Sequence, residues 1–413
     1  MSRGRGRVPA RSPHPAVPRR AFHHRLRALA AGLGSALLVA TGCGGPPDRP
    51  PLPPRPSPSP SPSATAVGKP GGTLRIAGTG DASGDPGWAD TDAQRLLVRM
   101  VSRQLYSYPA ADPNPRRPVT PTPDLADGPP QVGDGGRTWT VRLRPTVRWD
   151  VPASRRVTAT DVARGLKRLC TPPRPAPLRG YFAATITGFT AYCTDLARTR
   201  PAAARAYVEG RSIPGVQVVG DDTVVFRLLR PANDFTSILA LPAASPVPLE
   251  ALADPPDSPA YRSHLVSDGP YRFSDPKPGE TARLSRNPVW DPGSDPLRRA
   301  YVDHVTLRLG LSAAAVQEQL ERGQADMSWD TAVPAGRVPA LHAGRDPRLS
   351  LTGPPALVVL AYGLRGPAAG ALRSAAVRQA LTWCVDKRAL LPAFGGADLA
   401  RPSGQLLLPG TDG

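Results

Sequence analysis

A tract rich in proline and serine, residues 44–70, limits where this chain can fold. It reads GGPPDRPPLPPRPSPSPSPSATAVGKP in one-letter code. Such a composition cannot bury a hydrophobic core and favours extended polyproline II, at about 3.1 Å per residue. Its 27 residues therefore span roughly 80 Å at most. We predict that residues 43–70 form a semi-rigid tether and that folded structure begins at Gly71.

The residues before the tether have the plan of a secretory signal. Residues 1–42 contain eight arginines and no acidic residue, and residues 28–42 carry no charge. A basic segment, a short apolar segment and small residues before a cleavage point are typical of signal peptides. The apolar run is too short for a membrane span, which needs about 20 residues. We predict that residues 1–42 are removed from the mature protein.

A cysteine follows this segment directly. Ala40-Thr41-Gly42-Cys43 resembles a bacterial lipobox, although Ala40 stands where leucine is usual. The resemblance implies lipidation of Cys43 and a protein held at the extracellular face of the cell membrane. The alternative is an ordinary cleaved signal with an incidental cysteine. Arg19-Arg20-Ala21-Phe22 also resembles a twin-arginine export signal, with Pro18 in place of Ser or Thr, and the route of export stays open.

The net charge of the chain is +19, from 52 basic and 33 acidic residues. Eight of the basic residues lie in the predicted signal, which leaves 44 against 33 and a net charge of +11. No block of Lys and Arg with interleaved aromatic residues follows residue 43. We therefore expect a solvated basic surface and no nucleic-acid partner.

The remaining cysteines are Cys170, Cys193 and Cys384. An exported protein meets oxidising conditions, so we predict a disulfide between Cys170 and Cys193. Closing a loop of this length stabilises a fold by roughly 3 kcal/mol in the chain-entropy account. The alternative is two unpaired thiols. Cys384 lies in the apolar run LTWCVD, where we expect a free thiol in the core.

Strand-like and helix-like segments alternate after Gly71, which favours an α/β protein. Thr158 and Asp161 are spaced as a capping box at the start of a helix. From hydrophobic periodicity we expect strands within 71–77, 137–150, 215–231, 267–290, 301–310 and 355–364, and helices at 93–106, 157–169, 313–323 and 375–391.

Motifs for catalysis are missing from the sequence. Only three histidines follow the leader, none at ligand spacing, and neither a nucleophile elbow nor a P-loop occurs. Gly78-Thr79-Gly80 follows a predicted strand, but the next glycine is misplaced for a dinucleotide fingerprint. Residues 274–277 match S-x-x-K, but two prolines disfavour the helix that motif needs. We predict a receptor without enzyme activity, metal or cofactor.

Eight segments, taken in order, resemble the family 5 extracellular solute-binding proteins, which serve ABC importers of peptides, nickel and related solutes. The resemblance covers residues 71–413. Its segments are 71–74, 125–162, 245–248, 269–271, 286–288, 301–303, 323–326 and 377–381.

The resemblance implies a type II periplasmic-binding-protein fold, with two lobes that form a cleft and a domain inserted into the first lobe. Lobe I would comprise residues 71–108 and 249–355, the inserted domain 109–248, and lobe II 356–413. Family chains continue well past the region matched by residues 408–411. The resemblance thus implies that lobe II is incomplete and that this chain is C-terminally truncated.

The same resemblance implies where a ligand binds. The loop after the first strand would line the cleft at Asp90, Thr91 and Asp92. The strand after Asp326 would contribute Trp329 and Asp330, and Tyr362 would lie on the crossover to lobe II. Carboxylates and aromatic rings suit a cationic or peptide-like ligand. Each of these six could instead be an ordinary surface or core residue.

These expectations together describe a lipid-anchored monomer that captures a peptide or other small solute between two lobes. It would deliver the solute to the membrane subunits of an ABC permease. One alternative is a receptor for a nickel chelate or another small solute. A second is a truncated envelope lipoprotein that does not transport.

Overall fold

The structure, a computed structural model, describes residues 68–109, 120–274, 281–350, 357–367, 369–394, 396, 400–404 and 406. All of these lie in one compact unit, Ala66–Gly413. The predicted signal, Cys43 and most of the tether lie outside the described residues. Within those ranges, no helix has both the length and the hydrophobicity to cross a membrane.

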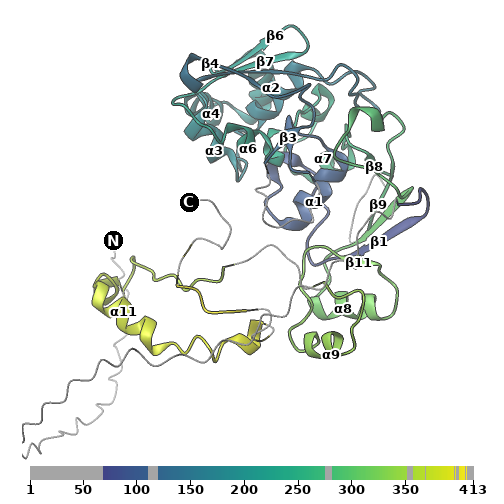
Figure 1. Cartoon of the computed structure of the whole chain (residues 1–413). Coiled ribbons are helices and arrows are strands. Elements are labelled where there is room, and N and C mark those ends of the chain that lie inside the picture. Colours follow the sequence, from purple (N-terminus) through teal and green to yellow (C-terminus); the bar gives the residue numbers. More distant parts are fainter. Residues whose placement is uncertain are drawn as a thin grey trace, which may run out of the picture. The chain divides into compact units, whose positions relative to one another are not determined.

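A five-stranded sheet combines the first strand of the described chain with four strands that follow residue 270. Its order is β11-β1-β10-β9-β8, with β1 parallel to β10 and β11 and the remaining pairs antiparallel (Figure 1). The strands are β1 (Thr73–Ala77), β8 (Tyr271–Phe273), β9 (Thr281–Arg286), β10 (His304–Arg308) and β11 (Met327–Ser328). Segments about 230 residues apart therefore meet in one sheet.

Helices cover this sheet on both faces, because successive side chains of a strand point to opposite sides. Ile76 packs with Leu97 and Val101 of α1 (Asp92–Val101) in one buried cluster. Ala77, the next residue, packs instead with Val316 of α8 (Ala313–Glu321). Of the shorter helices, α7 spans Pro259–Ser263 and α9 spans Val338–Ala343.

A second, antiparallel sheet has the order β4-β5-β7-β6. Its strands are β4 (Gln131–Gly133), β5 (Thr138–Arg142), β6 (Val216–Val219) and β7 (Thr223–Arg227), and β2 (Tyr106–Ser107) pairs separately with β3 (Thr122–Pro123). The helices near it are α2 (Ala159–Arg168), α3 (Arg179–Thr185), α4 (Phe189–Ala197), α5 (Ala204–Gly210) and α6 (Phe235–Leu239). Phe235 stands edge-on to the rings of Trp139 and Phe226 at the centre of the largest core cluster.

Buried ion pairs join the two sheet regions. Arg103 and Arg298 share the carboxylate of Asp124, at 2.7 and 2.8 Å. Arg168 of α2 donates to both oxygens of Asp85, at 2.8 and 2.6 Å, and lies over the rings of Trp88 and Tyr261. Removing one partner of such a pair leaves a buried charge, which typically costs about 3–5 kcal/mol of stability.

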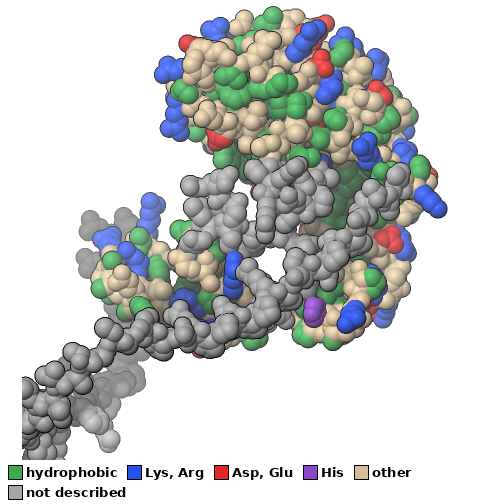
Figure 2. All heavy atoms as spheres, viewed as in Figure 1, with side chains coloured by type: hydrophobic (Ala, Val, Ile, Leu, Met, Phe, Trp, Pro, Cys, Tyr) green, Lys and Arg blue, Asp and Glu red, His purple; other side chains and the backbone are tan. Residues whose placement is uncertain are grey.

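The described basic side chains on the face in Figure 2 are dispersed rather than gathered into one patch.

Most predicted elements are confirmed, and the mixed α/β class with them. The capping box of α2 forms as expected, with Thr158 and Asp161 bonded reciprocally. In β5, Trp139 and Val141 are buried while Arg142 is exposed.

Four predictions are wrong. The helix expected over 93–106 ends at Val101, because Arg103 turns inward to the buried ion pairs. The described part of the strand expected at 355–364 forms no strand, and the helix expected over 375–391 is shorter, α11 (Ala375–Cys384), preceded by α10 (Ala369–Leu372). Cys384 is free but exposed rather than in the core, because an apolar pattern does not specify which segment will cover it. The domain boundaries given above stay predictions.

Candidate functional site

The carboxyl ends of three strands meet at one edge of the five-stranded sheet. Gly78 follows β1, Leu309 follows β10 and Trp329 follows β11. Ligands of open α/β sheets bind outside the carboxyl ends of parallel strands. The loop at residues 78–80 is fixed there through its backbone. Gly78 donates to the carbonyl of Arg308 at 2.9 Å, and the carbonyl of Gly80 accepts from Gly310 at 2.9 Å.

Asp330 locks this loop from the side. Its carboxylate accepts from the backbone N–H groups of Thr79 and Gly80, at 2.9 and 2.6 Å for Oδ2, and from the Thr79 hydroxyl at 3.3 Å. A side chain at residue 78 would not fit, since a Cβ there would lie 2.9 Å from Asp330 Oδ1 and 3.0 Å from Trp329 Nε1. Glycine is therefore favoured at residue 78, where the loop passes close to the side chains of Asp330 and Trp329.

Two polar groups at this edge are left without partners. The carbonyl of Thr79 accepts no hydrogen bond from any described residue, and Thr79 is exposed. Trp329 packs half-buried against the core of the sheet, and its Nε1 is enclosed without an acceptor among the described residues. A buried polar group left unpaired costs about 1–3 kcal/mol. The edge thus holds one exposed backbone acceptor and one enclosed indole donor.

Asp90, Thr91 and Asp92 lie at the start of α1, and the next residue, Ala93, lies close to Gly80 of the loop. The Thr91 hydroxyl accepts from the Gln94 N–H at 3.3 Å, and Gln94 Oε1 accepts from the Asp90 N–H at 3.1 Å. Asp92 pairs with Arg95 at 2.9 Å and is 80% exposed. Thr91 therefore caps the helix, and Asp92 forms an ordinary surface pair worth little energy.

Tyr362 is not brought to this edge by any described contact. Its hydroxyl lies 3.3 Å from the carbonyl of Arg378 and 3.2 Å from the hydroxyl of Thr382 on α11. The loop residues Gly78, Thr79 and Gly80 are the ones that sequence reasoning missed. The sequence signal for them was a G-x-G directly after a strand. Besides a dinucleotide site, such a pattern can indicate that the backbone passes close to another residue, here Asp330.

Cys170 and Cys193 are bonded to each other in the structure, with 4.8 Å between their Cα atoms. The bridge joins the segment just after α2 to α4. None of the residues at the sheet edge belongs to these elements. No group of three or more His, Cys, Asp or Glu side chains suited to a metal ion occurs in the part of the chain that the structure describes.

Known proteins share this architecture. The family described as bacterial extracellular solute-binding proteins, family 5, matches residues 120–412. The probable deoxycholate-binding periplasmic protein YgiS of Escherichia coli (strain K12) is 25% identical over 215 residues, which cover 51% of this chain and 36% of the relative. The periplasmic oligopeptide-binding protein OppA of Salmonella typhimurium is 26% identical over 196 residues, 47% and 33% of the two chains.

Solved structures agree on the fold. The clavulanic acid biosynthesis oligopeptide binding protein 2 is 33% identical with a TM-score of 0.55, over 66% of this chain and 47% of the other. The murein tripeptide-binding protein MppA in its open form, 20% identical, has a TM-score of 0.52 over 67% and 49%. The alignments span about a third of the curated relatives' length and about half of the solved chains. Because the family match covers well over half of the present chain, the protein belongs to the family 5 bacterial extracellular solute-binding proteins.

Proposed function

We propose that this protein captures a peptide or a similar small solute at the carboxyl edge of the five-stranded sheet. The observation that supports this is the loop at residues 78–80, which is held by hydrogen bonds to the Asp330 carboxylate, here called the Asp330 latch. Asp330 accepts hydrogen bonds from the loop's N–H groups, while the Thr79 carbonyl and the Trp329 indole make no hydrogen bond with a described residue. Backbone groups bind the main chain of a peptide regardless of its side chains. Such a site suits a receptor that accepts peptides of many sequences.

The finer parts of the proposal come from the sequence and the relatives. We propose that the protein is a monomer anchored through lipid on Cys43 at the outer face of the membrane, and that it delivers its ligand to the membrane subunits of an ABC permease. We assign it no chemistry of its own. The names of two relatives, both oligopeptide-binding proteins, support a peptide as the ligand.

Trp329 offers a direct test. We expect a mixture of tripeptides to change the intrinsic fluorescence of the full chain in a saturable way. Trp329→Phe should remove most of that change, because the indole borders the loop. Trp383→Phe is the matched control, since Trp383 is 88% exposed on α11. An equal signal in both variants would count against the sheet edge as the site.

Asp330→Ala tests the latch itself. Without this carboxylate the loop has to become ordered when a peptide binds, which costs free energy. We therefore expect peptide affinity to fall roughly tenfold, the equivalent of about 1.4 kcal/mol. Asp326→Ala is the control. Asp326 also ties β11 to β1, through Arg75 at 2.6–3.2 Å, without touching the loop. Isothermal titration calorimetry with the same tripeptides gives both affinities.

The alternatives predict other outcomes of the same titrations. A response to nickel bound by free histidine, with none to tripeptides, would favour the chelate receptor. A folded chain that responds to neither would favour an envelope lipoprotein that does not transport.

A further inference from the structure

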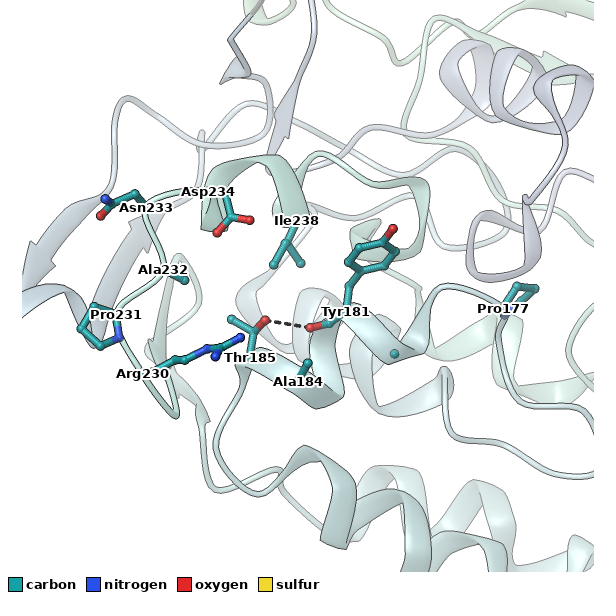
Figure 3. Close-up of a pocket in the computed structure, with 11 residues that line it drawn as sticks. Pro177, Tyr181, Ala184, Thr185, Arg230, Pro231, Ala232, Asn233, Asp234 and Ile238 are labelled. Carbon is teal, nitrogen blue, oxygen red and sulfur yellow. Dashed lines mark hydrogen bonds between the residues drawn. The ribbon is translucent and has the colours of Figure 1, made fainter. Parts of the chain in front are cut away.

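A cavity in the described structure lies away from the sheet edge. It has a volume of about 790 Å³ and opens between α3, α6 and the segment 230–234 (Figure 3). Nothing in the proposed capture of peptides uses it. Its polar lining comes from Arg230, Asn233, Asp234, Tyr181 and Thr185, and its apolar lining from Pro, Ala and Ile side chains.

The charged side chains of this cavity have no partner within the described structure. Both residues are exposed, and neither the Arg230 guanidinium nor the Asp234 carboxylate makes a hydrogen bond or an ion pair with a described residue. Asp234 is the N-cap residue of α6, yet its side chain accepts no capping hydrogen bond. An aspartate there usually stabilises a helix by about 0.5–2 kcal/mol. This carboxylate instead borders the cavity.

The cavity also has an apolar side. Ile238 is buried to 8% exposure at its base, and the Tyr181 ring is 56% exposed on α3. Figure 3 shows Arg230 reaching toward Thr185, with Asp234 and Ile238 on the α6 side and Tyr181 farther along α3. Opposite charges thus lie at one end, near an apolar wall and an available aromatic ring. Small-molecule sites combine such walls with a few polar groups.

We propose that this cavity binds a small zwitterion with an apolar side chain, of the class of free α-amino acids. Its carboxylate pairs with Arg230, whose planar fork suits a carboxylate. Its ammonium group pairs with Asp234, and its side chain packs on Ile238 and Tyr181. The site is separate from the sheet edge and does not depend on the peptide proposal.

L-phenylalanine is the probe that tests this, titrated into the full chain by calorimetry and saturation-transfer NMR. N-acetyl-L-phenylalanine lacks the ammonium charge, and L-phenylalaninamide lacks the carboxylate. We expect saturable binding of phenylalanine, and roughly tenfold weaker binding of each analogue, as for loss of one charged hydrogen bond. Binding of both analogues as tightly as phenylalanine would overturn the proposal.

Variants connect each charge to its residue. Arg230→Gln should abolish the preference for phenylalanine over the amide, and Asp234→Asn the preference over the acetyl derivative. Arg211→Gln is the control, because Arg211 is exposed after α5 and its side chain has no described partner. Thermal melts should match the parent, since Asp234 caps nothing. Unchanged affinity in both cavity variants, or loss of phenylalanine binding in Asp330→Ala, would refute the site.

Discussion

At the scale of single residues, the carboxyl group of Asp268 is buried with only one of its two oxygens hydrogen-bonded to a described residue. It is fully buried, its Oδ1 accepts from the Arg103 N–H at 2.9 Å, and its Oδ2 has no described partner. Burial raises the pKa of Asp268 to about 8, with the Asp124 carboxylate acting in the same direction and Arg103 and Arg298 opposing it. Burial also raises the pKa of Asp150 to about 6.

These shifts predict that stability falls as pH rises. Between pH 4 and 8 the folded state retains a proton on Asp268 that the unfolded chain, with an aspartate pKa of about 3.9, releases. The free energy of unfolding should therefore decline by up to about 4 kcal/mol between pH 5 and 8 through this group. Asp268→Asn should flatten the decline, measured as urea midpoints at several pH values.

Asp92→Asn provides the comparison for that experiment, because Asp92 is exposed and should leave the slope as in the parent. If the Asp268→Asn and parent curves ran parallel over the whole range, the carboxyl group would have to be ionised in the folded protein. Its neighbours Arg103 and Arg298 would then outweigh its burial.

At the scale of elements, the capping box shows what a sequence can reveal. Thr158 and Asp161 interact within one helical turn, so their spacing alone indicates the start of α2. The end of α1 could not be seen this way, because Arg103 pairs with Asp124 and approaches Ser294 across the fold. The Asp330 latch joins residues about 250 apart, and no local pattern contains it. The sequence placed Asp330 at the ligand; the structure shows it holding the loop.

Among the described glycines, Gly165 in α2 leaves the least room for a side chain. A Cβ at this residue would lie 2.2 Å from the carbonyl oxygen of Ser245, a backbone atom that cannot move aside cheaply. We predict that Gly165→Ala destabilises the fold by about 1–3 kcal/mol through overpacking. Gly210→Ala, at the end of α5 with open space around it, should be neutral or stabilise by up to about 1 kcal/mol. Urea unfolding of both variants checks this, and equal midpoints would contradict it.

At the scale of the whole molecule, the described part is tied together by contacts distant in sequence. β1 pairs with strands that follow residue 300, and Asp124 binds arginines on both sides of it in the chain. The α/β class and the family could be predicted because each motif is local and their order is preserved. The cavity at Arg230 and Asp234 could not, since its walls come from helices with no shared pattern.

Membrane attachment is the property of the whole molecule that a single residue should decide. Cys43→Ser should release the protein from the membrane fraction into the medium, because each buried CH₂ of a lipid chain contributes about 0.8 kcal/mol and no other anchor is predicted. Cys384→Ser, at the exposed free thiol, should stay with the membrane. Fractionation and the mass of the mature N-terminus report both. A parent protein whose mature N-terminus carried no lipid mass on Cys43 would contradict the lipobox interpretation. The protein would then carry an ordinary cleaved signal with an incidental cysteine.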